Sequence, residues 1–134
     1  MTRKGCDSGF FLLLGFGHLL AKQIWQEAAA GNYNLVISTL TIHEVLVIHF
    51  RRGKTKEAEG FRRLIYSAPW LRIVPVSSSI AERSAGYRHG LGLSTADSII
   101  LATAVEEGCD ELMTTDRHFA IAANQGIIKV NLLR

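Results

Sequence analysis

Short aliphatic and β-branched runs alternate with helical segments along all 134 residues of the chain. Strand-like runs occupy residues 35–38, 71–76, 111–115 and 127–133. Strands that alternate with helices form βαβ units, in which helices cover both faces of a parallel sheet. The alternation therefore predicts a three-layer α/β/α fold. An all-helical bundle is the main alternative, and the β-branched runs argue against it.

Capping residues and glycines mark the ends of the predicted helices. Ser94 opens a helix that Gly108 ends, and the capping-box spacing of Ser79 and Glu82 predicts another helix start. Pro75 indicates that the run 71–76 lies near a sheet edge. Further helices are expected over residues 18–30, 39–50 and 55–67 and directly after Asp116.

Composition and charge narrow the class of protein. A hydrophobic fraction of 48% argues for a globular chain, and 134 residues predict a single domain spanning 1–134. The net charge of +3 permits an anionic partner without requiring one. Two cysteines, Cys6 and Cys109, indicate neither a disulfide framework nor a zinc site, so the expected compartment is the cytoplasm. The apolar run 10–20 is too short to span a membrane, and Asp7 before it argues against a signal peptide.

Four acidic residues fall where the predicted strands end or the next helices begin. They are Asp7, Glu44, Asp97 and Asp116. In an open parallel sheet these positions share the carboxyl edge, where functional residues gather. Crowded carboxylates repel one another, and hard divalent cations such as Mg²⁺ or Mn²⁺ neutralise them through oxygen ligands. A carboxylate cluster of this kind suggests metal-assisted phosphoryl chemistry.

Each acid also has a structural interpretation. Asp97 has the spacing of a capping-box acid after Ser94, and Asp116 is placed to cap the helix that follows it. Asp7 is placed as a turn residue, and Glu44 as an acid at the border of an apolar helix face. Only the convergence of all four acids on one edge of the sheet favours a functional site over these structural roles.

Residues 91–119, LGLSTADSIILATAVEEGCDELMTTDRHF, strongly resemble the C-terminal half of PIN-domain nucleases, in particular VapC-type toxins. The resemblance continues upstream, where 36–46 is similar to the family's strand, Ser/Thr and Glu-bearing helix, and 7–11 to its opening Asp–Ser/Thr motif. It implies a central parallel sheet of order 3-2-1-4-5. The family's first strand is strongly apolar, whereas residues 1–6 read MTRKGC. We therefore expect either a short strand beginning near Gly5 or an atypical start.

The resemblance also implies an activity. The protein is expected to be a Mg²⁺- or Mn²⁺-dependent endoribonuclease that attacks the RNA phosphodiester with a metal-bound water, and to be the toxin of a toxin–antitoxin pair. By motif position, Asp7, Asp97 and Asp116 are expected metal ligands, and Glu44 binds the metal directly or through water. Ser8 and Thr114 are expected to orient ligands or water from behind them. A non-catalytic PIN-like module that binds protein or RNA remains the alternative.

Other residues carry weaker signals. The basic run that includes Arg51, Arg52 and Lys54 is expected either as a solvated loop or as a contact for RNA phosphates, and Arg88 as a solvated cation or a phosphate contact. The five histidines, His118 among them, are expected to be solvated or to lie at interfaces. The helices over 40–68 carry more apolar residues than one face needs, which predicts a partner surface, and the resemblance implies a homodimer. Those apolar residues are Ile42, Val45, Leu46, Ile48, Phe50, Phe61, Leu64 and Ile65.

Overall fold

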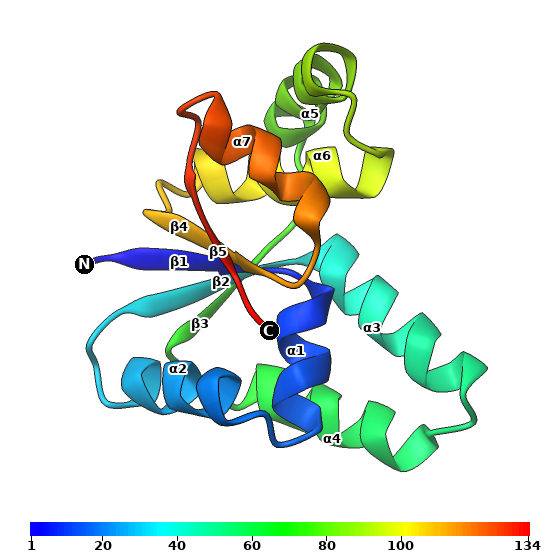
Figure 1. Ribbon diagram of the computed structural model, residues 1–134. Coiled ribbons are helices and arrows are strands. Elements are labelled where there is room, and N and C mark those ends of the chain that lie inside the picture. The colour runs from blue at the N-terminus through cyan, green and yellow to red at the C-terminus, as the bar shows by residue number, and fades with distance from the viewer.

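A five-stranded parallel sheet forms the centre of the computed structural model, which describes residues 1–134 (Figure 1). The strands are β1 (Arg3–Cys6), β2 (Asn34–Ser38), β3 (Leu71–Val74), β4 (Glu111–Thr114) and β5 (Lys129–Leu132). Their order is β3-β2-β1-β4-β5, and every neighbouring pair is parallel. Both the predicted order and the edge position of the third strand are confirmed.

Helices cover both faces of this sheet. They are α1 (Ser8–Gly15), α2 (Leu19–Ala29), α3 (Thr39–Arg51), α4 (Thr55–Tyr66), α5 (Ser78–Leu91), α6 (Thr95–Glu106) and α7 (Ala120–Asn124), with a 3₁₀ turn, η1, at Arg117–Phe119. In Figure 1, α1, α2 and α4 lie on one face and α5, α6 and α7 on the other, while α3 leaves the carboxyl edge of the sheet. The predicted three-layer α/β/α fold is confirmed.

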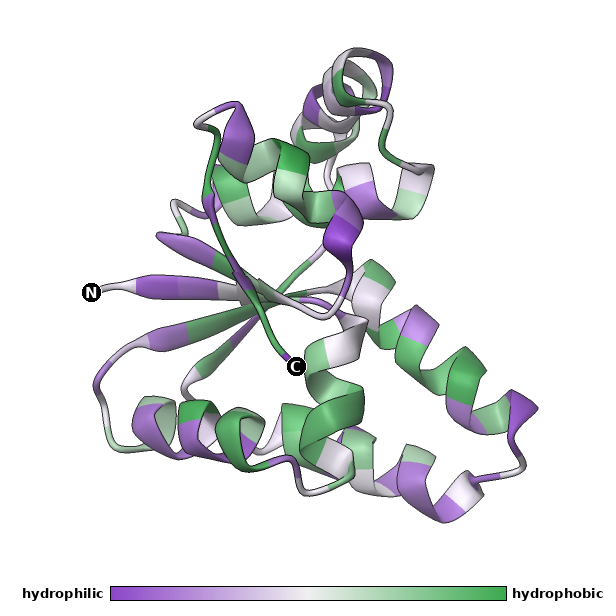
Figure 2. Cartoon of the chain, in the orientation of Figure 1, coloured by the Kyte–Doolittle hydropathy of each residue, from purple (hydrophilic) through white to green (hydrophobic).

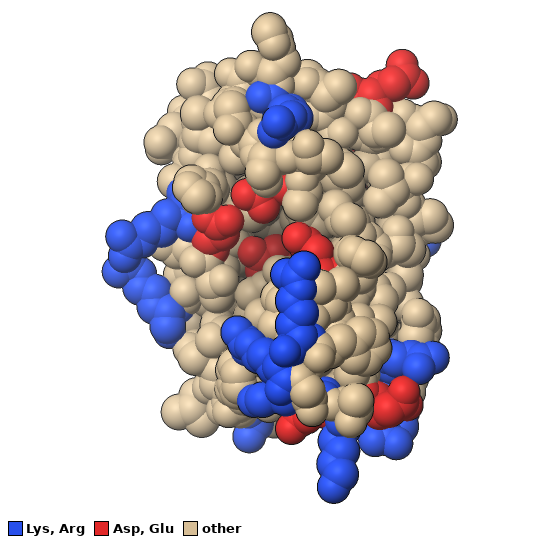
Figure 3. All heavy atoms as spheres, turned by 90° about the vertical axis from the view of Figure 1, so that its right-hand side faces the viewer, with Lys and Arg blue, Asp and Glu red and all other residues tan.

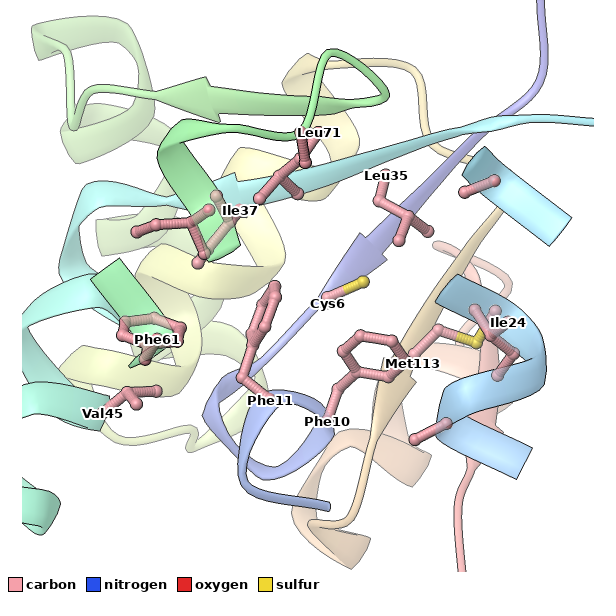
Figure 4. Packing of buried hydrophobic residues seen from close by; sticks show 14 of the residues in the cluster. Cys6, Phe10, Phe11, Ile24, Leu35, Ile37, Val45, Phe61, Leu71 and Met113 are labelled. Atoms are coloured by element: carbon pink, nitrogen blue, oxygen red, sulfur yellow. The ribbon is translucent and has the colours of Figure 1, made fainter. Parts of the chain in front are cut away.

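The larger part of the core lies between the sheet and the layer of α1, α2 and α4. Phe10 and Phe11 of α1 are buried there, against apolar side chains of β2 and β4 (Figure 4). The ring of Phe11 meets that of Phe61 edge-on at 5.6 Å between centroids. The apolar run 10–20 thus forms α1 and the start of α2, and two of its aromatic residues, Phe10 and Phe11, fill the space under the sheet.

The first strand begins at Arg3, two residues before the position expected from the apolar pattern. Ion pairs explain how a polar start fits a central strand: Lys4 Nζ lies 3.0 Å from the carboxylate of the buried Glu111 and 4.2 Å from the centroid of the Tyr33 ring. Figure 2 shows the change from hydrophilic to neutral colour along β1. Beyond Lys4 a Cβ on Gly5 would lie 3.1 Å from that of Ala104, so α6 packs directly on the strand backbone.

The expected start of α5 is wrong by two residues. Ser77, not Ser79, caps the helix by accepting a hydrogen bond from the amide of Ile80, at 3.2 Å. The Ser79 hydroxyl donates instead to the carboxylate of Glu106, which ties α5 to α6. The helix ends at Leu91 and is followed by Gly92, whose φ of 70° favours glycine.

Most of the apolar residues of α3 and α4 that predicted a partner surface are covered within the chain, and only Phe61 and Leu64 among them line a groove beside α1. Val45, Phe61 and Ile65 belong to the core, and Ile42 and Leu46 pack against it. Of the large apolar side chains expected there, only that of Phe50 is strongly exposed, because the two helices turn their apolar faces toward α1 and the sheet. None of the helices has both the length and the apolar character needed to cross a membrane.

Candidate functional site

Asp7 lies at the carboxyl end of β1, where the strand turns into α1. It is the N-cap of α1, with Oδ1 accepting a hydrogen bond from the amide of Phe10 at 3.1 Å. Its side chain is buried, and Oδ2 accepts a hydrogen bond from the Thr114 hydroxyl. Both carboxylate oxygens are therefore held, and the turn-residue interpretation of Asp7 is too simple.

Thr114, the last residue of β4, connects Asp7 with Asp116. Its hydroxyl donates to the Asp7 carboxylate and accepts from the amide of Asp116 at 2.8 Å. Since one hydroxyl serves both neighbours, it fixes the spacing between the ends of β1 and β4. Thr114, expected from the resemblance to orient ligands or water, thus contacts two of the four acids. Ser8 begins α1 beside Asp7 and is half-buried.

Asp97, Asp116 and His118 form the tightest cluster of potential ligands. One donor atom of each lies within 4.8 Å of the others. Asp97 sits in the first turn of α6, where its amide donates to Ser94 Oγ at 3.1 Å. Oδ1 of Asp116 accepts from the amide of His118 at 2.9 Å and lies 3.0 Å from the ring Nδ1 of the same residue. Asp116 therefore both caps the 3₁₀ turn η1 and belongs to the cluster of potential ligands.

His118 is the residue of this site that the sequence interpretation undervalued. Its side chain is 81% exposed, in line with the expected solvation, yet its ring lies against Asp116. The available signal was the Asp-x-His spacing directly after β4, which a 3₁₀ turn folds back on itself. A histidine there is easily taken for a surface residue, because the sequence does not reveal that turn.

Glu44 projects from the second turn of α3 and is half-buried. Burial, followed by the charges of Asp97 and Asp7, raises the pKa of its carboxyl group above the ordinary value. Glu44 lies outside the tight cluster of Asp97, Asp116 and His118 but within electrostatic reach of two of the acids. The four predicted acids thus share one edge of the sheet, at unequal distances.

The other two shifted carboxyl groups show the same crowding. Burial, opposed by hydrogen bonds from Thr114 and Phe10, raises the pKa of Asp7 to about 6. For Asp97, burial and then the charge of Asp116 raise the pKa. Each shift reports a free-energy cost of ionisation that a nearby cation would offset.

Seen from the carboxyl edge, the acids form one red patch in a hollow, surrounded by Lys and Arg side chains (Figure 3). Carboxylate oxygens suit hard ions such as Mg²⁺ and Mn²⁺, and a single imidazole nitrogen is compatible with them. The donor set of Asp97, Asp116 and His118 therefore fits a divalent metal ion. Asp7 and Glu44 are further carboxylates at the same edge of the sheet.

The basic residues predicted as candidate contacts for RNA phosphates lie on different elements. Arg51 ends α3, whereas Arg52 and Lys54 line a groove beside α1. Arg88 donates from its guanidinium to the carbonyl of Leu93 at 3.0 Å, which holds the connection that leads to Ser94. Arg88 therefore has a structural contact of its own.

The chain is similar to known proteins both in sequence and in fold. The PIN domain family matches residues 6–125, whereas no curated protein is significantly similar in sequence. A toxin–antitoxin complex from Klebsiella pneumoniae shares 29% identity, with a TM-score of 0.71 over 96% of this chain and 95% of that chain.

More distant structures share the fold. VapBC2 from Rickettsia felis, bound to a promoter DNA fragment, superimposes with a TM-score of 0.79 at 15% identity, covering 98% of each chain. VapC20 from Mycobacterium tuberculosis, a sarcin-ricin loop cleaving toxin, gives 0.71 at 20% identity, covering 89% of this chain and 94% of that one. The match of 6–125, most of the chain, together with these folds confirms the resemblance seen in residues 91–119: the chain belongs to the PIN domain family.

Proposed function

We propose that the chain, as a single PIN-like domain of residues 1–134, is a Mg²⁺- or Mn²⁺-dependent endoribonuclease. The observation that carries the proposal is the convergence of Asp97 and Asp116, with ligand atoms within 4.8 Å, at the sheet edge where Thr114 fixes Asp7. Membership of the PIN domain family supports it. The similarity in fold to VapC20, a sarcin-ricin loop cleaving toxin, favours RNA as the substrate.

Asp97 and Asp116 are the proposed metal ligands, with Asp7 and Glu44 binding directly or through water. The bound ion would polarise the phosphodiester and make water a stronger nucleophile at neutral pH. The Thr114 hydroxyl holds the Asp7 carboxylate in one orientation, and the Thr114–Asp116 contact fixes the second acid relative to it. Without a cation the acids repel an RNA phosphate, so we expect cleavage to require the metal.

Cations at the margin of the site are proposed to bind the RNA backbone. Arg51, Arg52 and Lys54 lie at the α3–α4 turn, and Arg88 at the end of α5. Contacts with phosphates release counterions, so each cation that binds RNA makes affinity fall more steeply with salt. Arg88→Ala should therefore reduce the salt dependence of RNA binding by about one phosphate contact.

The test of the activity compares matched acid-to-amide variants. The wild type, Asp97→Asn and Asp110→Asn are incubated with a structured RNA pool in Mg²⁺, Mn²⁺ or EDTA. Asp110 is an exposed acid that precedes β4 at the opposite end of that strand, so its variant controls for the loss of one charge. Metal-dependent cleavage that only Asp97→Asn abolishes supports the proposal. RNA binding without cleavage in all three proteins would favour the non-catalytic binding module instead.

An antitoxin is the proposed protein partner, and a groove beside α1 offers a place for it. The groove has a volume of about 550 Å³ and runs between α1, α2 and α4. Phe11, Trp25 and Phe61 line it, while the exposed ring of Phe16 lies 5.5 Å from Lys54 Nζ at its margin. Among the charged side chains that line it, Lys22, Arg52 and Lys54 outnumber Glu57, which favours an apolar segment with acidic residues.

This partner is testable with Phe16→Ser, which alters an exposed residue and leaves the core intact. Co-expression with the antitoxin of a neighbouring reading frame should give a complex with the wild type and a weaker one with the variant. Asp97→Asn serves as the control, because it lies outside the groove. We further propose a homodimer, to be checked by light scattering, and action in the cytoplasm, where the free thiols of Cys6 and Cys109 stay reduced.

A further inference from the structure

His118 lies closer to the acidic centre than an ordinary surface histidine. Its amide and its ring Nδ1 both contact Oδ1 of Asp116, at 2.9 Å and 3.0 Å. These two contacts from one residue fix the ring against the carboxylate. In the same cluster, a donor atom of Asp97 lies within 4.8 Å of the other two.

The distance between Nδ1 of His118 and Oδ1 of Asp116 has the size of one edge of a coordination octahedron. Metal–ligand bonds of about 2.1 Å at right angles place neighbouring ligand atoms about 3 Å apart. The separation in the structure is 3.0 Å, so both atoms can bind one ion with little movement of either side chain. The high exposure of the ring leaves room for that adjustment.

We propose that His118 is a nitrogen ligand of the metal site and shifts its preference from Mg²⁺ toward first-row transition ions. The inference rests on the proposed metal-dependent function. Mg²⁺ takes oxygen ligands and rarely nitrogen, whereas imidazole binds Mn²⁺ more readily and Co²⁺ more strongly still. An all-carboxylate site would lack this discrimination.

The alternative role for His118 is to orient Asp116 without touching the ion. In that case the imidazole acts as a hydrogen-bond donor to the carboxylate, and all metals lose affinity alike when it is removed. A ligand role predicts instead a loss that grows from Mg²⁺ through Mn²⁺ to Co²⁺. The order of the losses therefore separates the two roles.

The experiment measures metal binding directly, without RNA. Calorimetric titrations with Mg²⁺, Mn²⁺ and Co²⁺ compare the wild type with His118→Phe, Asp97→Asn and the control His89→Phe, whose exposed histidine lies on α5. His118→Phe should weaken Co²⁺ and Mn²⁺ binding by about tenfold or more and Mg²⁺ binding by less than about threefold. Pulsed EPR of the Mn²⁺-loaded wild type should show coupling to a directly bonded ¹⁴N that disappears in His118→Phe only.

Two results would overturn the inference. The first is an equal loss of affinity for the three ions in His118→Phe, or Mn²⁺ spectra without directly bonded nitrogen, while Asp97→Asn still abolishes binding. Either observation would place His118 outside the ligand set. Failure of the wild type to bind any of the ions would instead reject the metal site itself, and the proposed function with it. The Asp97→Asn arm thus distinguishes the two failures.

Discussion

Replacing Asp7 with Asn should stabilise the metal-free protein at neutral pH. The carboxyl group is buried, and burial raises its pKa from an ordinary 3.8 to about 6. A shift of about two units at 1.4 kcal/mol each makes the ionised group cost the folded state about 3 kcal/mol above pH 6. Asn lacks the charge and retains the oxygen that caps α1.

One smaller, opposing effect sets the net result. The Thr114 hydroxyl loses its acceptor when Oδ2 of Asp7 becomes an amide nitrogen, which costs about 1 kcal/mol. The expected gain in the free energy of unfolding is therefore about 2 kcal/mol at pH 7.5 in EDTA. Because the folded-state pKa is raised, the protonated group stabilises the fold fully below pH 3.8, and this contribution is lost as the pH rises through about 6.

Urea unfolding at pH 5, 6, 7 and 8 in EDTA measures both consequences. Acidification from pH 8 to 5 should stabilise the wild type relative to Asp7→Asn, and the two curves should converge near pH 5. Asp110→Asn, with an exposed carboxyl group, controls for net charge. Saturating Mn²⁺ should reverse the order, because only the wild type retains the full ligand set. A variant that is less stable than the wild type at pH 7.5 in EDTA, with an unchanged pH dependence, would refute the reasoning.

Three further substitutions test how the site is held. Thr114→Val should cost about 2 kcal/mol in urea unfolding and slow RNA cleavage, whereas Thr114→Ser should restore both. Gly9→Ala should lower stability by about 1–2 kcal/mol, because its Cβ would lie 2.0 Å from Oγ1 of Thr115, while Gly15→Ala, with open space around it, should leave stability equal or higher. Equal thermal midpoints for those two variants would contradict the close packing. Glu111→Ala should cost up to about 3 kcal/mol, read from chemical unfolding, since two lysines lose their buried partner.

The parts of the fold that local chemistry determines could be predicted from the sequence. Around α6, the cap at Ser94 and the stop near Gly108 bound a helix that the structure places at Thr95–Glu106. The β-branched run of β2 and the apolar run of β4 were equally clear, because both strands are buried on two faces. Since the acids directly follow or begin these elements, their shared edge could be predicted as well.

What could not be predicted depends on contacts between distant segments. The polar start of β1 is accommodated by pairs with distant acids, Lys4 with Glu111 and Arg3 with Glu107, and no local pattern reveals that pairing. Ser79 does not cap α5 because it lies inside the helix that Ser77 already caps, and its hydroxyl binds Glu106, 27 residues away. The apolar surplus of α3 and α4 resembled a partner surface until α1 was in place to cover it.

Positions at helix starts also explain how three of the four acids are held together without a cation. Asp7 is the N-cap of α1, Asp116 is the N-cap of η1, and Asp97 lies in the first turn of α6. Backbone amides donate to the carboxylates of Asp7 and Asp116. The positive N-terminal ends of the α1 and α6 dipoles also stabilise the negative charges of Asp7 and Asp97. Each such contact stabilises a carboxylate by about 0.3–1 kcal/mol at an exposed helix end. The pKa of Asp7 stays raised to about 6 even with the hydrogen bonds from Thr114 and Phe10, so the caps fix the positions of the acids while burial, and after it the neighbouring charges, still penalises ionisation. This remaining cost of ionisation would favour a bound divalent ion, and it arises because three acids that cap or begin helices are also partly or fully buried at one edge of the sheet.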